Sequence, residues 1–315
     1  MNIFANPNFN FMNKRIPIYF ISGLFILIGL VVIIINGGLK YNIDFSGGLA
    51  LEIAPIEVAV DETESSYLTV TQIRETLNRG GIGDFEIQEL PNTRSFLIKA
   101  KSEGGIGDQI VEVLKAEFPE HTAEADFIRA QDEVGPRAGA DLRAKAVNSV
   151  LISLFFILLY IWIRFRFTWG FIAALGLFHD VMITLIILSF MGMEIGMTIL
   201  AAMLTVVGYS INNTIVIFDR IRENLKLYRK EDDFQIVNRS INETLNRTIV
   251  MAFTTLLVNI SLMTFGGPVI FDFAFTFMVG VLAGTYSSML LVTGVVLDTV
   301  LALKKRKAVA IKGKR

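Results

Sequence analysis

Six long apolar runs constrain the fold of this chain more than any other feature of its sequence. At a helical rise of about 1.5 Å per residue, each run can cross most of a hydrocarbon layer about 30 Å thick. The runs cover residues 18–35, 146–163, 168–193, 195–218, 248–265 and 273–303. Composition agrees, because 53% of the 315 residues are hydrophobic and only 19% are charged. The sequence therefore predicts an α-helical polytopic membrane protein with six transmembrane helices, the first at 18–36 and the other five in a bundle at 146–303.

Charge is distributed unevenly along the chain, and this predicts its topology. Residues 37–146 hold 11 basic against 20 acidic side chains, a net of −9, whereas the remainder holds 18 against 10, a net of +8. Arg164 and Arg166 join spans two and three, seven basic residues lie between spans four and five, and seven lie in the tail 304–315. The opposite short loops contain no Lys or Arg. By the positive-inside rule we expect the N-terminal segment 1–17, the loop 219–247 and the tail to be cytoplasmic, with residues 37–145 outside.

The first run follows Lys14 and Arg15, as the apolar core of a signal sequence would. Only Asn36-Gly37-Gly38 comes after it, and this is not a small-residue cleavage site. We therefore expect an uncleaved anchor.

The acidic segment 37–145 reads as a folded domain. Segments 85–90 and 95–100 alternate apolar and polar residues around Pro91-Asn92, which is a hairpin signal. The predicted order is β-α-β-β-α-β, an α+β ferredoxin-like arrangement between the first two spans. Its other strands are expected at 49–55 and 122–130, and its helices at 71–78 and 110–118. This fold has many uses and does not identify a function by itself.

Residues 234–245 place apolar side chains at helical spacing within the predicted loop. The pattern fits an interfacial helix lying on the inner leaflet, and it fits equally a helix packed on the bundle.

Several kinds of chemistry are excluded or disfavoured. The chain has no Cys, so thiol catalysis and Cys-based zinc sites are ruled out. Two Gly-rich segments at 80–83 and 104–107 superficially resemble phosphate-binding loops, but they read as turns in an acidic domain. The basic tail borders a span and reads as a topology signal, not a nucleic-acid site. We expect no enzymatic activity, no bound metal and no cofactor.

Span four carries a strip of polar residues. Thr205, Tyr209 and Asn212 recur at i, i+4 and i+7, with Asn213 alongside. Polar groups in hydrocarbon must face protein or a wet cavity, so we expect this helix to be interior and the strip to line a pathway. The strip leads toward Asp219 and Arg220, which we interpret as an ion pair at the membrane boundary.

Span five adds polar residues near one face, beginning with Arg247 and Thr248 and continuing with Thr255. Asn213 lies five residues inside Phe218, roughly 7.5 Å by helical rise, so Arg247 could meet it at similar depth. Two alternatives stay open, in which Arg247 snorkels to headgroups and the asparagines only tie helices together.

Span three contains a titratable pair, His179 and Asp180. We favour a structural or boundary role for it over a proton relay.

Five stretches resemble one family. Residues 42–49 read Asn-Ile-Asp-Phe-Ser-Gly-Gly-Leu, and 134–139 read Val-Gly-Pro-Arg-Ala-Gly. Residues 207–223 contain Gly-Tyr-Ser-Ile-Asn-Asn, while 244–248 read Thr-Leu-Asn-Arg-Thr and 265–268 read Phe-Gly-Gly-Pro. In this order and topology they resemble the SecF family, the six-span subunits of bacterial SecD–SecF protein-export complexes in the RND superfamily.

The resemblance implies late-stage protein export across the bacterial cytoplasmic (inner) membrane, powered by an ion gradient such as the proton motive force. The implied partners are SecD, the SecYEG channel, YajC, exported polypeptides and membrane lipid. The family's ion pathway uses membrane carboxylates and an arginine. The arginine corresponds to Arg247, and the usual span-four carboxylate corresponds to Asn213.

Asn213 is a departure from the family pattern, because an amide cannot titrate. Either the carboxylate of SecD is sufficient or the coupling ion is Na⁺, which an Asn carbonyl could ligate; a plain interhelical hydrogen bond is equally open. Two rival functions also stay open. They are a passive assembly subunit that stabilises SecD, and an RND-type small-molecule exporter.

Overall fold

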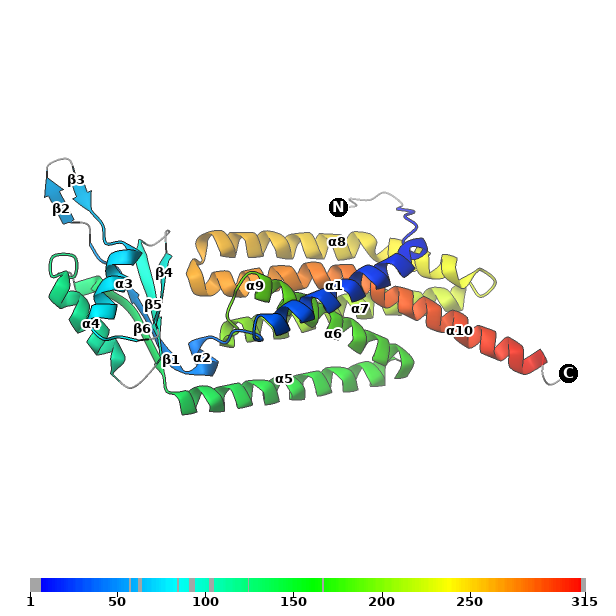
Figure 1. The fold of residues 1–315 in the computed structure, drawn as a ribbon. Helices are drawn as coiled ribbons and strands as arrows, with labels where there is room; N and C mark the ends of the chain where they lie inside the picture. The colour runs from blue at the N-terminus through cyan, green and yellow to red at the C-terminus, as the bar shows by residue number, and fades with distance from the viewer. Residues whose placement is uncertain are drawn as a thin grey trace. The chain divides into compact units, whose positions relative to one another are not determined.

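The computed structural model describes residues 7–56, 58–61, 64–83, 85–90, 94–101, 105–123, 125–165 and 167–312. Arg166, the predicted turn at Pro91-Asn92 and the last three residues of the tail lie outside this range. The chain divides into two units, a membrane unit of Met1–Lys40 and Ser149–Arg315 and an α+β unit of Tyr41–Asn148 (Figure 1).

Six helical segments in the described part are long and apolar enough to cross a membrane, which confirms the predicted number. The sixth segment is formed by an α-helix, a short π-helical turn and a second α-helix in succession. The helices are α1 (Arg15–Ile35), α5 (Pro136–Arg164), α6 (Phe167–Phe190), α7 (Met197–Leu227), α8 (Asp233–Phe265), α9 (Gly267–Tyr286), the π-turn η3 (Ser287–Val292) and α10 (Thr293–Lys312). A short 3-10 turn, η1 (Met12–Lys14), precedes α1.

Helices α6, α7 and α9 form the centre of the membrane unit. Half of the apolar stretch of α6 is buried, compared with 11% of that of α5. Helix α9 contacts α6, α7 and α8, and the π-turn that follows it also contacts α6 and α7. The bundle core therefore lies around α9 and the π-turn.

Two glycines one turn apart allow α9 to approach α7 closely. A Cβ atom on Gly280 would overlap the side chain of Val206, and one on Gly284 would lie 3.0 Å from Cβ of Ser210. Small residues at this i, i+4 spacing are a common device for close helix packing in membranes.

The α+β unit is built on a four-stranded antiparallel sheet in the order β4-β5-β1-β6. This is the strand order of the ferredoxin-like arrangement, so the predicted fold class is confirmed. The strands are β1 (Gly48–Ile53), β4 (Phe85–Leu90), β5 (Ser95–Ala100) and β6 (Ile128–Val134). The bounds of β4 and β5 agree with the sequence prediction.

Two helices, α3 (Val70–Arg79) and α4 (Ile106–Glu117), lie on one face of this sheet (Figure 1). Strand β1 directs Leu49, Leu51 and Ile53 into the core between the sheet and the helices, and all three are fully buried. Their period-two spacing is what a strand needs to bury one face. Helix α3 begins with a capping box between Thr69 and Gln72.

The last strand was predicted at 122–130, and this placement is wrong. Residues Ala125–Phe127 form a 3-10 turn, η2, that buries Phe127, and β6 begins only at Ile128. Strand β6 pairs with β1 alone, at the edge of the sheet, and its residues are mostly exposed. An edge strand with polar residues on both faces lacks the alternation on which the prediction depended.

Three short elements have no counterpart in the predicted order. Strands β2 (Val58–Asp61) and β3 (Glu64–Ser66) form a separate antiparallel hairpin. A single helical turn, α2 (Ile43–Ser46), precedes β1.

The turn after α2 meets the start of α5 within the α+β unit. Gly47 has a φ of 75°, and a Cβ atom on it would lie 2.7 Å from Cα of Pro136. A Cβ atom on Gly139 would in turn lie 2.8 Å from the backbone nitrogen of Gly47. The two sequence stretches at 42–49 and 134–139 therefore form one corner, which we call the glycine corner, where backbone touches backbone.

The predicted loop 219–247 is almost entirely helical. Helix α7 continues to Leu227 and α8 begins at Asp233, so only residues 228–232 connect them. The apolar side chains of 234–245 do not face an interface, because Val237, Ile241 and Leu245 are buried in the bundle core. The interfacial-helix interpretation is wrong, and the alternative of a helix packed on the bundle is confirmed.

Candidate functional site

The polar strip of α7 lies on an exposed side of the helix in this chain. Thr205 and Asn212 are exposed and Tyr209 is partly buried, while the opposite side buries Val206 and Ser210. The hydroxyl of Thr205 donates to the carbonyl oxygen of Ala201 at 2.9 Å, which satisfies it within its own helix. Helix α7 is thus interior on one side, as predicted, and presents polar groups on the other.

Asn213 lies at the margin of this strip and is only 1% exposed. Neither its Oδ1 nor its Nδ2 atom has a hydrogen-bond partner, and the buried hydroxyl of Tyr209 also lacks one. The side chains of Asn213 and Thr255 are polar neighbours of that hydroxyl. An unsatisfied buried polar group costs about 1–3 kcal/mol, so this group of side chains is incomplete in the isolated chain.

The structure does not join Asn213 to Arg247. Arg247 is exposed and, within the described residues, takes part in no hydrogen bond or ion pair. The neighbouring Thr248 is 1% exposed and donates to the carbonyl oxygen of Thr244 at 3.1 Å. Thr255 similarly donates to the carbonyl oxygen of Met251 at 2.9 Å. The predicted meeting of amide and guanidinium is not present in this chain.

The predicted ion pair between Asp219 and Arg220 is wrong. Asp219 accepts from Nη2 of Arg164 at 2.7 Å, whereas Arg220 pairs with Glu223 at 2.7 Å and with Glu243 at 2.6 Å. Adjacent residues on a helix point in directions about 100° apart, so they select partners on different sides. Asp219 therefore links α7 to the end of α5, and Arg220 links α7 to α8.

A polar network fixes the extended ends of α7 and α8 to each other. Nδ2 of Asn224 donates to Oγ of Ser240 at 3.0 Å and to Oε2 of Glu243 at 2.6 Å, the carboxylate oxygen that also accepts from Nε of Arg220. Asn224 and Ser240 are buried. These contacts hold the end of α7 against the start of α8, so the segment between spans four and five is a helical hairpin.

The segment before α1 is held by two asparagines one turn apart on α8. Asn238 accepts from the backbone N–H of Phe11 at 2.9 Å and donates to the carbonyl oxygen of Phe9 at 2.9 Å. Asn242 donates to the same carbonyl and accepts from the N–H of Phe9, both at 2.9 Å. We call this arrangement the asparagine clamp. The two side-chain amides satisfy backbone N–H and C=O groups of Phe9 and Phe11, as a neighbouring strand would in a sheet. Met12, which follows this segment, is fully buried.

His179 and Asp180 lie inside the membrane unit, not at its boundary. They are 5% and 1% exposed, and Nδ1 of His179 is 3.0 Å from Oδ1 of Asp180. The hydroxyl of Ser210 on α7 donates to the other carboxylate oxygen at 2.5 Å. The central position of the pair in its apolar run was the available signal for this depth, but nothing in the sequence identified Ser210 as its partner.

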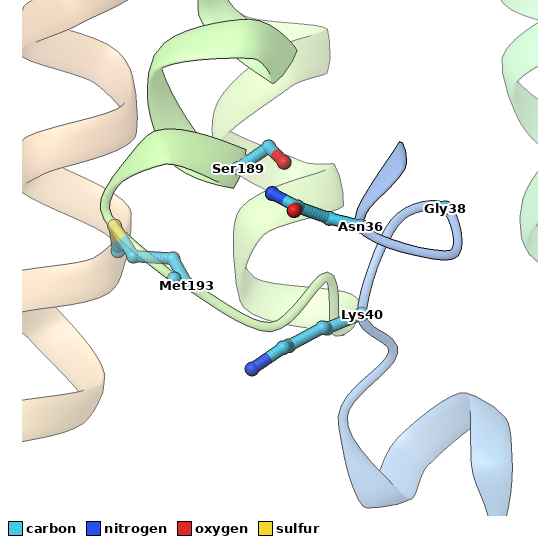
Figure 2. Close-up of a pocket in the computed structure, with 6 residues that line it drawn as sticks. Asn36, Gly38, Lys40, Ser189 and Met193 are labelled. Atoms are coloured by element: carbon cyan, nitrogen blue, oxygen red, sulfur yellow. The ribbon is translucent and has the colours of Figure 1, made fainter. Parts of the chain in front are cut away.

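A cavity of about 400 Å³ lies where the end of α1 approaches the loop between α6 and α7, and Figure 2 shows the residues that line it. The labelled side chains of Asn36, Lys40, Ser189 and Met193 line it (Figure 2). The carbonyl oxygen of Lys40 accepts from the N–H of Ile195 at 2.8 Å and ties the two connections together. None of the predicted pathway residues lines this cavity.

A comparison with protein-family models matches residues 114–302 to the C-terminal family of the protein export membrane proteins SecD/SecF. Among curated proteins, the protein translocase subunit SecF of Thermodesulfovibrio yellowstonii is 38% identical, over 94% of this chain and 96% of that protein. The SecF subunit of Rhodothermus marinus is also 38% identical, over 95% of each chain.

Two solved structures have the same fold. SecDF of Thermus thermophilus, described as a translocon-associated membrane protein, matches with a TM-score of 0.80 and 36% identity. A SecDF in its super-membrane-facing form matches with a TM-score of 0.69 and 35% identity. This chain is covered to 95% and 99%, but it spans only 39% and 41% of those longer chains.

The six apolar helices, the ferredoxin-like unit between the first two of them and the full-length likeness to curated SecF proteins lead to one assignment. This chain belongs to the SecF family of protein translocase subunits, which are multi-pass membrane proteins.

Proposed function

We propose that this subunit works with a SecD partner and couples an ion gradient to late-stage protein export. The observation that carries the proposal is the exposed polar side of α7. Asn212 lies exposed on a helix long and apolar enough to cross a membrane, where an amide has to face protein or water, and Thr205 and Tyr209 lie on the same side of that helix. This chain matches 39% and 41% of the two SecDF chains, and their combined name supports SecD as the partner.

Polar groups without hydrogen-bond partners lie next to the exposed polar side of α7, and they support an ion pathway between this subunit and SecD. The Asn213 amide and the Tyr209 hydroxyl are buried without partners, and Arg247 is a cation with no partner among the described residues. A carboxylate supplied by SecD has the chemistry to accept from the Asn213 amide nitrogen, the Tyr209 hydroxyl or the Arg247 guanidinium, whereas Oδ1 of Asn213 needs a donor or a cation. One charge moving through 100 mV provides about 2.3 kcal/mol, enough to bias a two-state domain movement roughly fiftyfold.

We further propose the topology expected from the charge distribution. The protein lies in the bacterial cytoplasmic membrane with both termini inside, and the α+β unit faces outward, where it contacts emerging polypeptides. SecYEG and YajC are the further proposed partners. The subunit carries out transport without hydrolytic chemistry.

The test is export by reconstituted vesicles that contain this chain, a SecD partner and SecYEG, under separately imposed proton and sodium gradients. Wild type is compared with Asn213→Asp and Asn213→Ala. We expect the Asp variant to change the pH or sodium dependence of export and the Ala variant to weaken export under the coupling gradient. Identical ion dependence in all three would remove Asn213 from the pathway.

One observation favours a passive assembly subunit as the second candidate. Arg247 and Asn213 do not contact each other here, as they need not in a subunit that only stabilises SecD. Export by the wild-type complex that ignores both gradients would establish this alternative and reject the coupling role.

A further inference from the structure

The pair His179–Asp180 is the one carboxylate–imidazole contact in the described part of the membrane unit. Asp180 is thirteen residues beyond Phe167 and ten before Phe190 at the ends of α6. These separations correspond to roughly 15–20 Å of helix on either side, which is the middle of the span. An ionisable residue at this depth is costly and is by default a sign of function.

Among the described residues, the side-chain partners of the Asp180 carboxylate are one imidazole and one hydroxyl. Oδ1 contacts Nδ1 of His179 and Oδ2 accepts from the hydroxyl of Ser210. No Lys or Arg in the described residues pairs with Asp180. The helices packed against α6 also carry Tyr19, Arg15 and Asp298, but these are bonded to one another.

The imidazole has a free position on its other side. Nε2 of His179 is buried without a hydrogen-bond partner. The ring lies beside that of Tyr286, with centroids 6.1 Å apart, and the Tyr286 hydroxyl is 2.8 Å from Oγ of Ser22 on α1. A polar line thus extends from α7 through α6 to α9 and α1.

The charge of the pair decides what it can bind. With a neutral imidazole and an ionised carboxylate, the bundle interior would hold a net charge of −1, which costs several kcal/mol. One added proton removes this charge, whether it resides on Oδ of Asp180 or completes an imidazolium on His179. A metal cation fits less well, because hard cations need about six oxygen ligands and the described residues contain no group of three or more His, Asp or Glu side chains that could hold one.

We propose that His179 and Asp180 together form a proton-binding site within this subunit, separate from Asn213 and Arg247. This deepens the proposed coupling function and rests on it. In the step itself one proton is taken up from one side and later released to the other, and an O–H or N–H bond is the only bond formed or broken. The site provides the titratable group that Asn213 cannot provide.

Binding at this site has a route to movement through Ser210. A hydrogen bond to an ionised carboxylate is stronger than one to a neutral acid, so protonation loosens the contact between α6 and α7. Ser210 packs on Gly284 of α9, and Tyr286 directly precedes the π-turn. Such π-turns occur often at functional sites. The contact that changes strength is therefore at the centre of the bundle.

The experiment uses the complex with a SecD partner, in lipid, and compares wild type with Asp180→Asn. The amide keeps the size and hydrogen bonds of the side chain but cannot take up a proton, so a merely structural role would tolerate it. Asp298→Asn is the matched control, because Asp298 is another carboxylate of the membrane unit and is paired with Arg15. Two readouts are made, export driven by a proton gradient and infrared titration of carboxylic-acid bands.

We expect Asp180→Asn to assemble normally, to lose gradient-driven export on the order of tenfold or more, and to lack one titrating acid band. Asp298→Asn should retain gradient-driven export and the titrating acid band. His179→Gln and Ser210→Ala each change one hydrogen bond of the carboxyl group, so they should shift the frequency of that band, and they preserve the test if Asp180→Asn fails to assemble. If Asp180→Asn exports as well as wild type and shows the same set of acid bands, the proposal of a proton-binding site is wrong. If wild-type export ignores the gradient, the coupling function fails, while the infrared titration still decides whether Asp180 binds a proton.

Discussion

Nζ of Lys304 donates to the carboxylate of Asp233 at 2.6 Å. Asp233 is only 3% exposed and lies in the first turn of α8, whereas the Lys304 side chain is 62% exposed on α10. The contact joins the start of one span to the end of another. A negative side chain is also favourable at a helix N-terminus, so two effects stabilise Asp233 where it is.

Lys304→Met should therefore destabilise the protein, because it leaves a buried carboxylate without its cation. We expect a loss of about 1–2 kcal/mol, since the exposed end of the lysine is partly screened by solvent. Thermal unfolding in detergent measures it. Lys305→Met is the control, as Lys305 is exposed, and equal melting temperatures for the two variants would contradict the prediction.

Asn238→Ala should release the N-terminal segment from the asparagine clamp. The change removes bonds to the backbone of Phe9 and Phe11, each worth about 1 kcal/mol, so amide exchange at Phe11 should accelerate on the order of tenfold. Hydrogen exchange followed by mass spectrometry reports it. Gln235→Ala, an exposed position on the same helix, should leave the exchange rate unchanged. Unaltered protection in Asn238→Ala would show that the clamp does not hold the segment.

Gly280→Ala should destabilise the bundle by about 1–3 kcal/mol, because the new methyl group would overlap Val206 in a well-packed contact. Gly23→Ala is the matched control. A Cβ atom there meets nothing within 4 Å, so alanine should be neutral or slightly stabilising through its better helix propensity. Comparison of their melting temperatures in detergent tests this, and a Gly280→Ala protein as stable as wild type would mean that α7 and α9 are not in close contact.

Arg247→Met should leave folding and SecD binding intact, because the side chain is exposed and makes no ion pair in the described structure. It should abolish gradient-dependent export if the guanidinium stabilises a carboxylate of the partner. Arg222→Met, which removes another exposed cation from the same side of the membrane unit, should export normally. Normal export by a stably assembled Arg247→Met complex would favour the passive role.

Much of the fold could be predicted because it depends on strong periodic signals. The apolar runs located all six spanning segments, and alternation located β4 and β5 at their observed bounds. Strand β6 was misplaced because its position is fixed by pairing with β1, not by its own pattern. The hairpin of β2 and β3 was not predicted, and these two short strands are likewise defined by their pairing with each other.

The candidate site was less predictable, because the depth of Arg247 was inferred from the start of an apolar run. Helix α8 begins at Asp233, so Arg247 lies fourteen residues inside a continuous helix and not at its end. The partners of Asp219 and Arg220 come from α5 and α8, and no pattern along α7 specifies them. Likewise, the depth of Asp180 could be estimated from the sequence, but its contact with Ser210 depends on how two helices pack.

The glycine corner has a mechanical consequence. Because Gly47 and Gly139 leave no room even for a methyl group, the first turn of α5 cannot swivel independently of the sheet to which α2 leads. The first turn of α5 therefore belongs to the same body as the sheet, and a larger residue at Gly47 or Gly139 would have to push the two apart.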